Sequence, residues 1–127
     1  MKYILMMHAG AGPYAVMNWP QKDLRAHIDF MMQLNKDLTE ASELVSCAGL
    51  TAPDQAKVVR AGKNGEPITD GVFPEAKEFL AGYWLIEVSN PERAYAIAAR
   101  ASSAPGPGGT PMNMPIEVRE LMAGPPK

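Results

Sequence analysis

The sequence predicts an α+β protein in which a split β-α-β sheet carries both of its helices on one face. The order of helical and strand-like segments along the chain favours this class. A long amphipathic segment at residues 21–42 and a second helical segment after Pro91 are separated by strand-like stretches, and further strand-like stretches precede the first and follow the second. The 127 residues are enough for a single core. We therefore expect one domain over residues 1–127.

Residues 2–8 are predicted to form the first strand, because they are apolar with little polar alternation. Its two faces carry Tyr3, Leu5 and Met7 on one side and Ile4, Met6 and His8 on the other. A loop rich in Gly and Pro then leads to the helix at residues 21–42, where apolar residues recur at steps of three and four. This apolar stripe consists of Leu24, Ile28, Met31, Leu34, Leu38 and Ala41.

The middle of the chain is predicted to form four extended segments. Residues 44–48 and 57–60 are short runs that end before glycine-containing turns. Residues 68–69 resume an extended conformation that ends at Asp70 and the glycine after it. Residues 83–88 are apolar on both faces, which indicates a strand with both faces covered.

The C-terminal part is predicted to contain one helix and one strand. Pro91 suits the first turn of a helix, and the alanine-rich run after it continues that helix. We expect the Pro/Gly-rich loop at residues 104–115 to be mobile or to contact a partner rather than to belong to the core. Residues 116–121 predict the last strand, and residues 123–127 a short tail. The order strand, helix, strands, helix, strand is that of a ferredoxin-like fold.

Strands that are apolar on both faces require a cover that this fold does not supply, because its two helices lie on one face of the sheet. The uncovered face would include Ile4 and Met6 of the first strand and half of residues 83–88. The most economical cover is the same face of a second copy, so we expect a homodimer.

Composition excludes several classes of partner. The formal net charge is −2, from 12 basic and 14 acidic residues, and no stripe of Lys and Arg indicates nucleic-acid binding. No run approaches the roughly 20 apolar residues that span a bilayer, and the apolar run at residues 3–7 is too short for a signal peptide. The one cysteine, Cys47, lies in an apolar stretch and is expected to be buried. These features favour a cytoplasmic protein without nucleic-acid or membrane partners.

Residues 69–88, TDGVFPEAKEFLAGYWLIEV, combine an Asp-Gly turn, a Phe-Pro step, charged residues and an aromatic strand. This motif resembles the signature of the YCII-related family, also called the DGPF-domain family. The start (MKYILMMHAG) and the end (IEVREL) also resemble that family's first and last strands. Val72 departs from the usual proline, and the loop at residues 104–115 is longer than the usual connection. The resemblance implies a dimeric α/β-barrel assembly of ferredoxin-like subunits, with a cleft between helices and sheet.

Asp70 and His27 are the candidate catalytic residues. Asp70 ends a strand beside apolar residues, which suits a carboxylate that transfers protons, although an Asp-Gly pair is also a common turn. His27 lies in the apolar stripe of the long helix and faces the sheet. It is an acid/base if the cleft is open at that end, and otherwise a core histidine that bonds to one backbone carbonyl.

Four further residues are candidates for ligand binding, namely His8, Phe73, Lys77 and Tyr83. His8 lines either the mouth of the cleft or the dimer interface. Phe73 and Tyr83 would form an apolar wall, and Lys77 is either solvated or steers an anionic ligand. Histidines and carboxylates do not occur at metal-ligand spacing, so we expect neither a metal nor another cofactor.

Two functions of different classes fit these residues. The first is a small cofactor-independent lyase or isomerase that moves a proton on a small organic molecule, with Asp70 as base and His27 or His8 as its partner. The second is a non-catalytic ligand-binding or regulatory dimer. A perturbed carboxylate beside a histidine would favour catalysis, and an entirely apolar pocket would favour binding.

Overall fold

The structure of the protein is a computed structural model that describes residues 1–9, 19–71 and 78–125. Its strands are β1 (Lys2–Ala9), β2 (Leu44–Gly49), β3 (Val58–Ala61), β4 (Pro67–Asp70), β5 (Phe79–Glu87) and β6 (Ile116–Glu120). Its helices are α1 (Gln21–Glu40) and α2 (Pro91–Ser102), and short 3₁₀ turns occur at Pro53–Gln55 and Pro107–Gly109. No helix in the described ranges is both long and apolar enough to cross a membrane.

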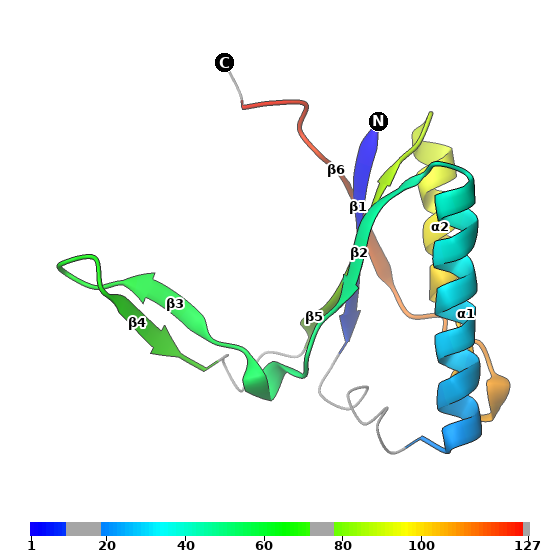
Figure 1. Cartoon of the computed structure of the whole chain (residues 1–127), viewed down its shortest axis with the longest axis horizontal. Coiled ribbons are helices and arrows are strands. Elements are labelled where there is room, and N and C mark those ends of the chain that lie inside the picture. The colour runs from blue at the N-terminus through cyan, green and yellow to red at the C-terminus, as the bar shows by residue number, and fades with distance from the viewer. Residues whose placement is uncertain (10–18, 72–77, 126–127) are drawn as a thin grey trace.

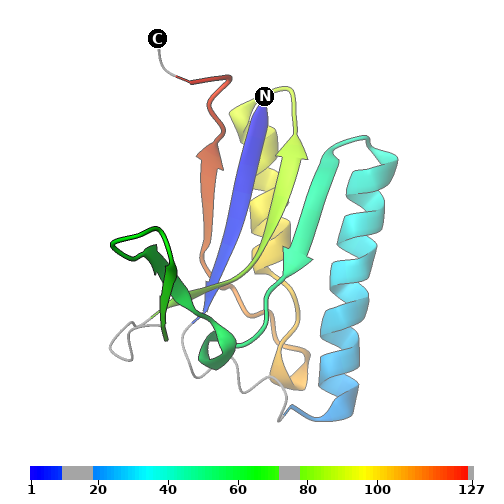
Figure 2. The ribbon, with the colours of Figure 1, turned by 60° about the vertical axis from the view of Figure 1, so that its left-hand side comes forward.

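Four strands form one antiparallel sheet in the order β2-β5-β1-β6. Both helices pack on the same face of this sheet (Figure 1, Figure 2). The predicted α+β class and the placement of both helices on one face are confirmed, and the arrangement is consistent with a ferredoxin-like fold. We call the other side of the sheet the open face.

Strands β3 and β4 form a separate hairpin instead of joining the main sheet. Their register pairs Val58 with Asp70 and Ala61 with Pro67. The hairpin projects from the open face, away from the helices (Figure 1, Figure 2). We call it the arm. Val58 and Val59 are exposed on it, so its apolar side chains pack against little within one chain.

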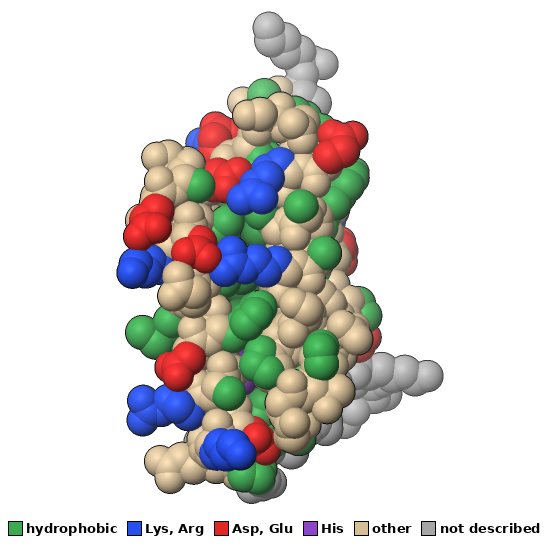
Figure 3. All heavy atoms as spheres, turned by 90° about the vertical axis from the view of Figure 1, so that its right-hand side faces the viewer, with side chains coloured by type: hydrophobic (Ala, Val, Ile, Leu, Met, Phe, Trp, Pro, Cys, Tyr) green, Lys and Arg blue, Asp and Glu red, His purple; other side chains and the backbone are tan. Residues whose placement is uncertain are grey.

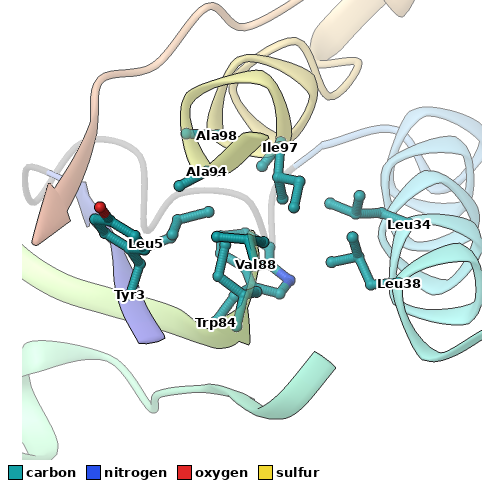
Figure 4. Close-up of a cluster of buried hydrophobic side chains, with 11 residues drawn as sticks. Tyr3, Leu5, Leu34, Leu38, Trp84, Val88, Ala94, Ile97 and Ala98 are labelled. Carbon is teal, nitrogen blue, oxygen red and sulfur yellow. The ribbon is translucent and has the colours of Figure 1, made fainter. Parts of the chain in front are cut away.

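The core lies between the helices and one face of the sheet (Figure 4). Alternation along β1 directs Tyr3 and Leu5 into it, as predicted, and α2 contributes mainly alanines, which let that helix approach the sheet closely. Its buried members are Tyr3, Leu5, Leu34, Leu38, Trp84, Ile86, Val88, Ala94, Ile97, Ala98 and Ala101. One apolar layer on one side of the sheet therefore supplies the buried core of the described chain.

The inward stripe of α1 differs by one position from the prediction. Leu34 and Leu38 are buried and His27 lies on the inward face one turn before Met31, all as expected, but Ile28 is exposed. The reason is the helical period, since positions 27, 31, 34 and 38 share a narrower face than the set that includes position 28. A histidine therefore takes a place on the face that packs against the sheet.

Polar contacts at the surface join α2 to α1 and to the connection that follows α1. The side chain of Asn90 caps α2 by accepting a hydrogen bond from the backbone N–H of Arg93 at 2.9 Å. The Arg93 guanidinium donates two hydrogen bonds to Glu43, of 2.8 and 2.7 Å, and these lower the pKa of the Glu43 carboxyl. Arg100 of α2 pairs with Asp37 of α1. Figure 3 shows side chains of both signs beside one another on this helix face.

The start of the loop at residues 104–115 is packed, which corrects the expectation for that part, whereas residues 107–111 are exposed. Ala104 is fully buried and Gly106 is buried. The backbone N–H of Gly106 donates to the carbonyl of Thr110 at 2.8 Å, and that of Met112 donates to the carbonyl of Ala104 at 2.9 Å. Proline removes a donor only at its own position, so the residues between the prolines still close a turn beside α1.

Cys47 is exposed, whereas its apolar sequence context predicted burial. It lies on β2, which pairs only with β5 and so forms an edge of the main sheet. Sequence context gives the polarity of neighbours along the chain, but it does not show that the strand lies at an edge.

Candidate functional site

A pocket of about 180 Å³ opens between α1 and the strands β2 and β5, on the helix side of the sheet. Residues from β1, α1, β2 and β5 line it, namely Met7, His27, Met31, Asn35, Cys47, Ala48, Gly49, Gly82, Tyr83 and Trp84. This is the cleft between helix and sheet that the resemblance implies. The lining is mostly apolar, with a few polar side chains, which is the usual composition of a small-molecule site.

Gly82 keeps the floor of this pocket open. It pairs with Met7 of β1 and Gly49 of β2 in the middle of the sheet. A Cβ atom at position 82 would lie 2.9 Å from the carbonyl oxygen of Ala48, a distance that side-chain carbons do not tolerate. Glycine here permits a close approach of the backbones, and the register of β1 and β5 shifts immediately beyond it.

His27 is held in one orientation by two contacts. Its Nδ1 lies 3.0 Å from the carbonyl oxygen of Pro105, in the packed loop. Its ring meets that of Trp19 edge to face, with centroids 5.6 Å apart and an interplanar angle of 88°. Because a carbonyl oxygen can only accept, Nδ1 must carry the proton, and the neutral ring presents Nε2 as an acceptor. Nε2 makes no hydrogen bond to any described residue.

Asn35 lies two turns further along α1 and is also fixed by a partner. The indole Nε1–H of Trp84 donates to its Oδ1 at 2.9 Å. An indole N–H is only a donor, so the contact identifies the oxygen of the Asn35 amide and leaves the NH₂ group as the other end. This amide group bonds to no other described side chain. The pocket therefore contains one fixed acceptor and one fixed amide donor.

The comparison of the chain with known families matches residues 1–108 to the YCII-related domain. The chain belongs to the YCII-related family. The match confirms the resemblance seen in the sequence motif and in the first strand. Among curated proteins, none matches the chain significantly.

The pocket of this YCII-related protein brings together two of the predicted site residues, His27 and Tyr83. His27 bonds to one backbone carbonyl and also lines the pocket, so its role as an acid/base stays a prediction. Sequence reasoning missed Asn35 and Trp84. The helical period contained a signal for Asn35, since this polar residue follows His27 by eight positions and so lies on a similar side of α1.

His8 lies outside the pocket, on the open face of the sheet. Its Nε2 is 3.3 Å from Oε1 of Glu117 on β6, and that nitrogen has no access to solvent although the side chain is 30% exposed. Arg119 lies 3.9 Å from the other oxygen of the same carboxylate. In the YCII-related chain, His8 is therefore absent from the pocket lining, and its place in a dimer interface stays a prediction.

Asp70 is exposed at the end of β4, in the arm of the YCII-related chain, and does not line the pocket. The single chain therefore does not bring Asp70 and His27 together in one site. Phe73 and Lys77 lie outside the described residues. Within the described ranges, no group of three or more His, Cys, Asp or Glu side chains could hold a metal ion.

Proposed function

We propose that the protein binds a small organic molecule in the pocket between α1 and the sheet and moves a proton on it, as a cofactor-independent lyase or isomerase. The observation that carries the proposal is the contact of His27 Nδ1 with the Pro105 carbonyl. It fixes the tautomer, so that Nε2 is the nitrogen free to take a proton from a bound molecule.

The surroundings of His27 support this role. Met7, Met31 and Trp84 line the same pocket and reduce the number of water molecules near a bound ligand. A proton taken by Nε2 gives an imidazolium, whose Nδ1–H bond to the carbonyl of Pro105 strengthens because the donor is then charged. The loop carbonyl thus helps to hold the charged form during transfer.

His27→Asn is expected to abolish proton transfer while lowering the ligand affinity by no more than about tenfold, the cost of one lost hydrogen bond. Asn keeps an N–H donor near the position of Nδ1 but provides no base. Fragments found by thermal shift in a screen of small aromatic and lactone compounds would be incubated in D₂O, and deuterium incorporation followed by NMR. We expect exchange with the natural chain to exceed that with His27→Asn by 10²-fold or more, the usual contribution of a general base.

Asp70→Asn is the matched comparison, because Asp70 is the other proposed base. Asn retains the turn-forming bonds of Asp and loses only its ability to take a proton. Normal exchange with Asp70→Asn and loss with His27→Asn would assign the proton transfer to His27. The reverse result would assign it to Asp70, and binding without exchange in the natural chain would support the alternative of a non-catalytic binding protein.

We also propose a homodimer formed through the open face, in which two sheets stack as in a dimeric α/β barrel. Ile4 and Met6 lie on this face of β1 and are only partly covered in one chain. The arm projects on the same side, and an isolated two-stranded hairpin with exposed valines is marginally stable in water. A second copy on the open face would give both β1 and the arm an apolar surface to pack against. It would also bring residues of a partner subunit near Asp70, which lies on the arm.

Met6→Glu is expected to convert the dimer to a monomer of 13.7 kDa at micromolar concentration, measured by light scattering. A carboxylate at position 6 would lose its hydration in the interface and would lie opposite the carboxylate of Glu117, its cross-strand neighbour on β6. Met32→Glu, on the exposed side of α1, is the control with the same change of residue and charge, and should leave the dimer intact. A natural chain that is monomeric under these conditions would refute the dimer.

A further inference from the structure

Resting on the proposed function, we infer that the pocket recognises a planar, single-ring molecule with a hydroxyl group at one end and a carbonyl oxygen at the other. His27 Nε2 accepts the hydrogen bond from the hydroxyl group, and the Asn35 NH₂ donates to the carbonyl oxygen. The inference follows from the two contacts that fix these side chains, His27 to Pro105 and Trp84 to Asn35.

The polarity of each end follows from these partners. The Pro105 carbonyl uses the Nδ1–H of His27, so a neutral His27 offers the ligand only an acceptor. The indole N–H of Trp84 holds Oδ1 of Asn35 on its own side, so the NH₂ group is the end of the amide that is left for the ligand. A ligand that satisfies both must donate at one end and accept at the other. A dicarboxylate would place an acceptor against the acceptor Nε2 of His27. A diamine would place a donor against the NH₂ group of Asn35.

The spacing of the two groups sets the length of the ligand. His27 and Asn35 are eight residues apart on α1, which is about 12 Å along the helix axis. Side chains on a helix lean toward its N-terminus by similar amounts, so this spacing persists at their ends. Each hydrogen bond occupies about 3 Å, which leaves roughly 6 Å between the two polar atoms of the ligand. That is the span across one para-substituted benzene ring.

The volume and the walls agree with one ring. The pocket holds about 180 Å³, which is below the range of roughly 300 to 1,000 Å³ typical of sites for drug-sized ligands. Met7 and Met31 supply thioether groups, which make favourable contacts with aromatic rings and adapt to their shape. Trp84 adds an aromatic surface to the lining, beside Asn35.

Three matched probes test the inference, namely 4-hydroxyacetophenone, 4-methoxyacetophenone, which lacks the hydroxyl donor, and 4-ethylphenol, which lacks the carbonyl acceptor. We expect 4-hydroxyacetophenone to bind about tenfold more tightly than either of the others, since each loses one hydrogen bond and leaves a pocket group unpaired. The NMR signal of the Trp84 indole N–H reports binding in the pocket, because that N–H contacts Asn35 directly.

Asn35→Asp supplies the decisive variant. Asp has nearly the same shape and still accepts from the Trp84 indole, but it offers the ligand a carboxylate oxygen in place of a donor. The preference for 4-hydroxyacetophenone over 4-ethylphenol should disappear in this variant, and the preference over 4-methoxyacetophenone should remain. Asn64→Asp makes the same change in the exposed turn of the arm and should preserve both preferences.

The outcomes separate this inference from the proposed function. Equal affinities for the three probes, with a shifted Trp84 signal, would overturn the inference and leave a ligand-binding pocket in place. Preferences that Asn35→Asp does not change would also overturn it. If neither these probes nor any compound of the wider screen shifts the Trp84 signal, both the inference and the proposed function are wrong.

Discussion

Replacing Leu34 with Ala is expected to lower the free energy of unfolding by about 2 to 5 kcal/mol. Leu34 is fully buried and lies in the cluster where α1 meets α2 and the sheet, near Leu38 and Ile97 (Figure 4). Truncation removes three heavy atoms from a closely packed layer, and α1 is fixed at its surface by the Arg100–Asp37 pair, so the site can collapse only in part. The loss of contacts adds to the cost of the cavity.

Met32→Ala is the matched control, because it lies on the same helix but is 64% exposed. Its change in unfolding free energy should stay within about 0.5 kcal/mol. Urea unfolding at one fixed protein concentration measures both, since a dimer makes the transition concentration-dependent. Similar losses in the two variants would mean that the inward face of α1 is not the one described.

Secondary structure was largely predictable because most elements carry a strong local pattern. The helix expected at residues 21–42 occurs as α1, and the alternation of Tyr3 and Leu5 predicted which face of β1 is buried. Strand β5 is longer than predicted, because it begins at Phe79 rather than at residue 83. Pairing with β1 extends it, and pairing is a tertiary property that no local pattern in residues 79–82 reveals.

The errors at Cys47 and at residues 104–115 have a common physical cause. Each expectation took composition as a measure of burial. Cys47 is exposed because β2 forms an edge of the sheet, and Ala104 is buried because the loop folds back beside α1. Burial depends on which elements become neighbours, and neither position contains information about that.

The candidate site was predictable where it lies on one helix and not where it depends on contacts between distant segments. His27 follows from the inward stripe of α1. Its partner Pro105 is 78 residues away, and the Trp84–Asn35 bond joins residues 49 apart. Asp70 shows the opposite limit, since a motif can be recognised in order along the chain while its first residues lie on the arm and Gly82, Tyr83 and Trp84 line the pocket.

Deleting residues 106–109 is expected to lower the free energy of unfolding by about 2 to 4 kcal/mol. Several hydrogen bonds worth about 1 kcal/mol each are lost, and the buried side chain of Ala104 is partly exposed. The deletion removes the Gly106–Thr110 bond and the bridge between Pro105 and Pro111. It also displaces the carbonyl that holds His27, so the preference for a hydroxyl group in the pocket should weaken as well. Thermal unfolding should show a fall in Tm of roughly 10 °C.

A deletion of equal length, residues 62–65, is the control for this loop. Those residues form the turn of the arm, and their backbone bonds, from Gly62 to Glu66 and from Gly65 to Gly62, stay within the hairpin. Shortening this turn should change the unfolding free energy of the main sheet by less than about 1 kcal/mol, since it removes no core contact. Equal Tm values for the two deletions would mean that the loop at residues 104–115 contributes nothing to packing.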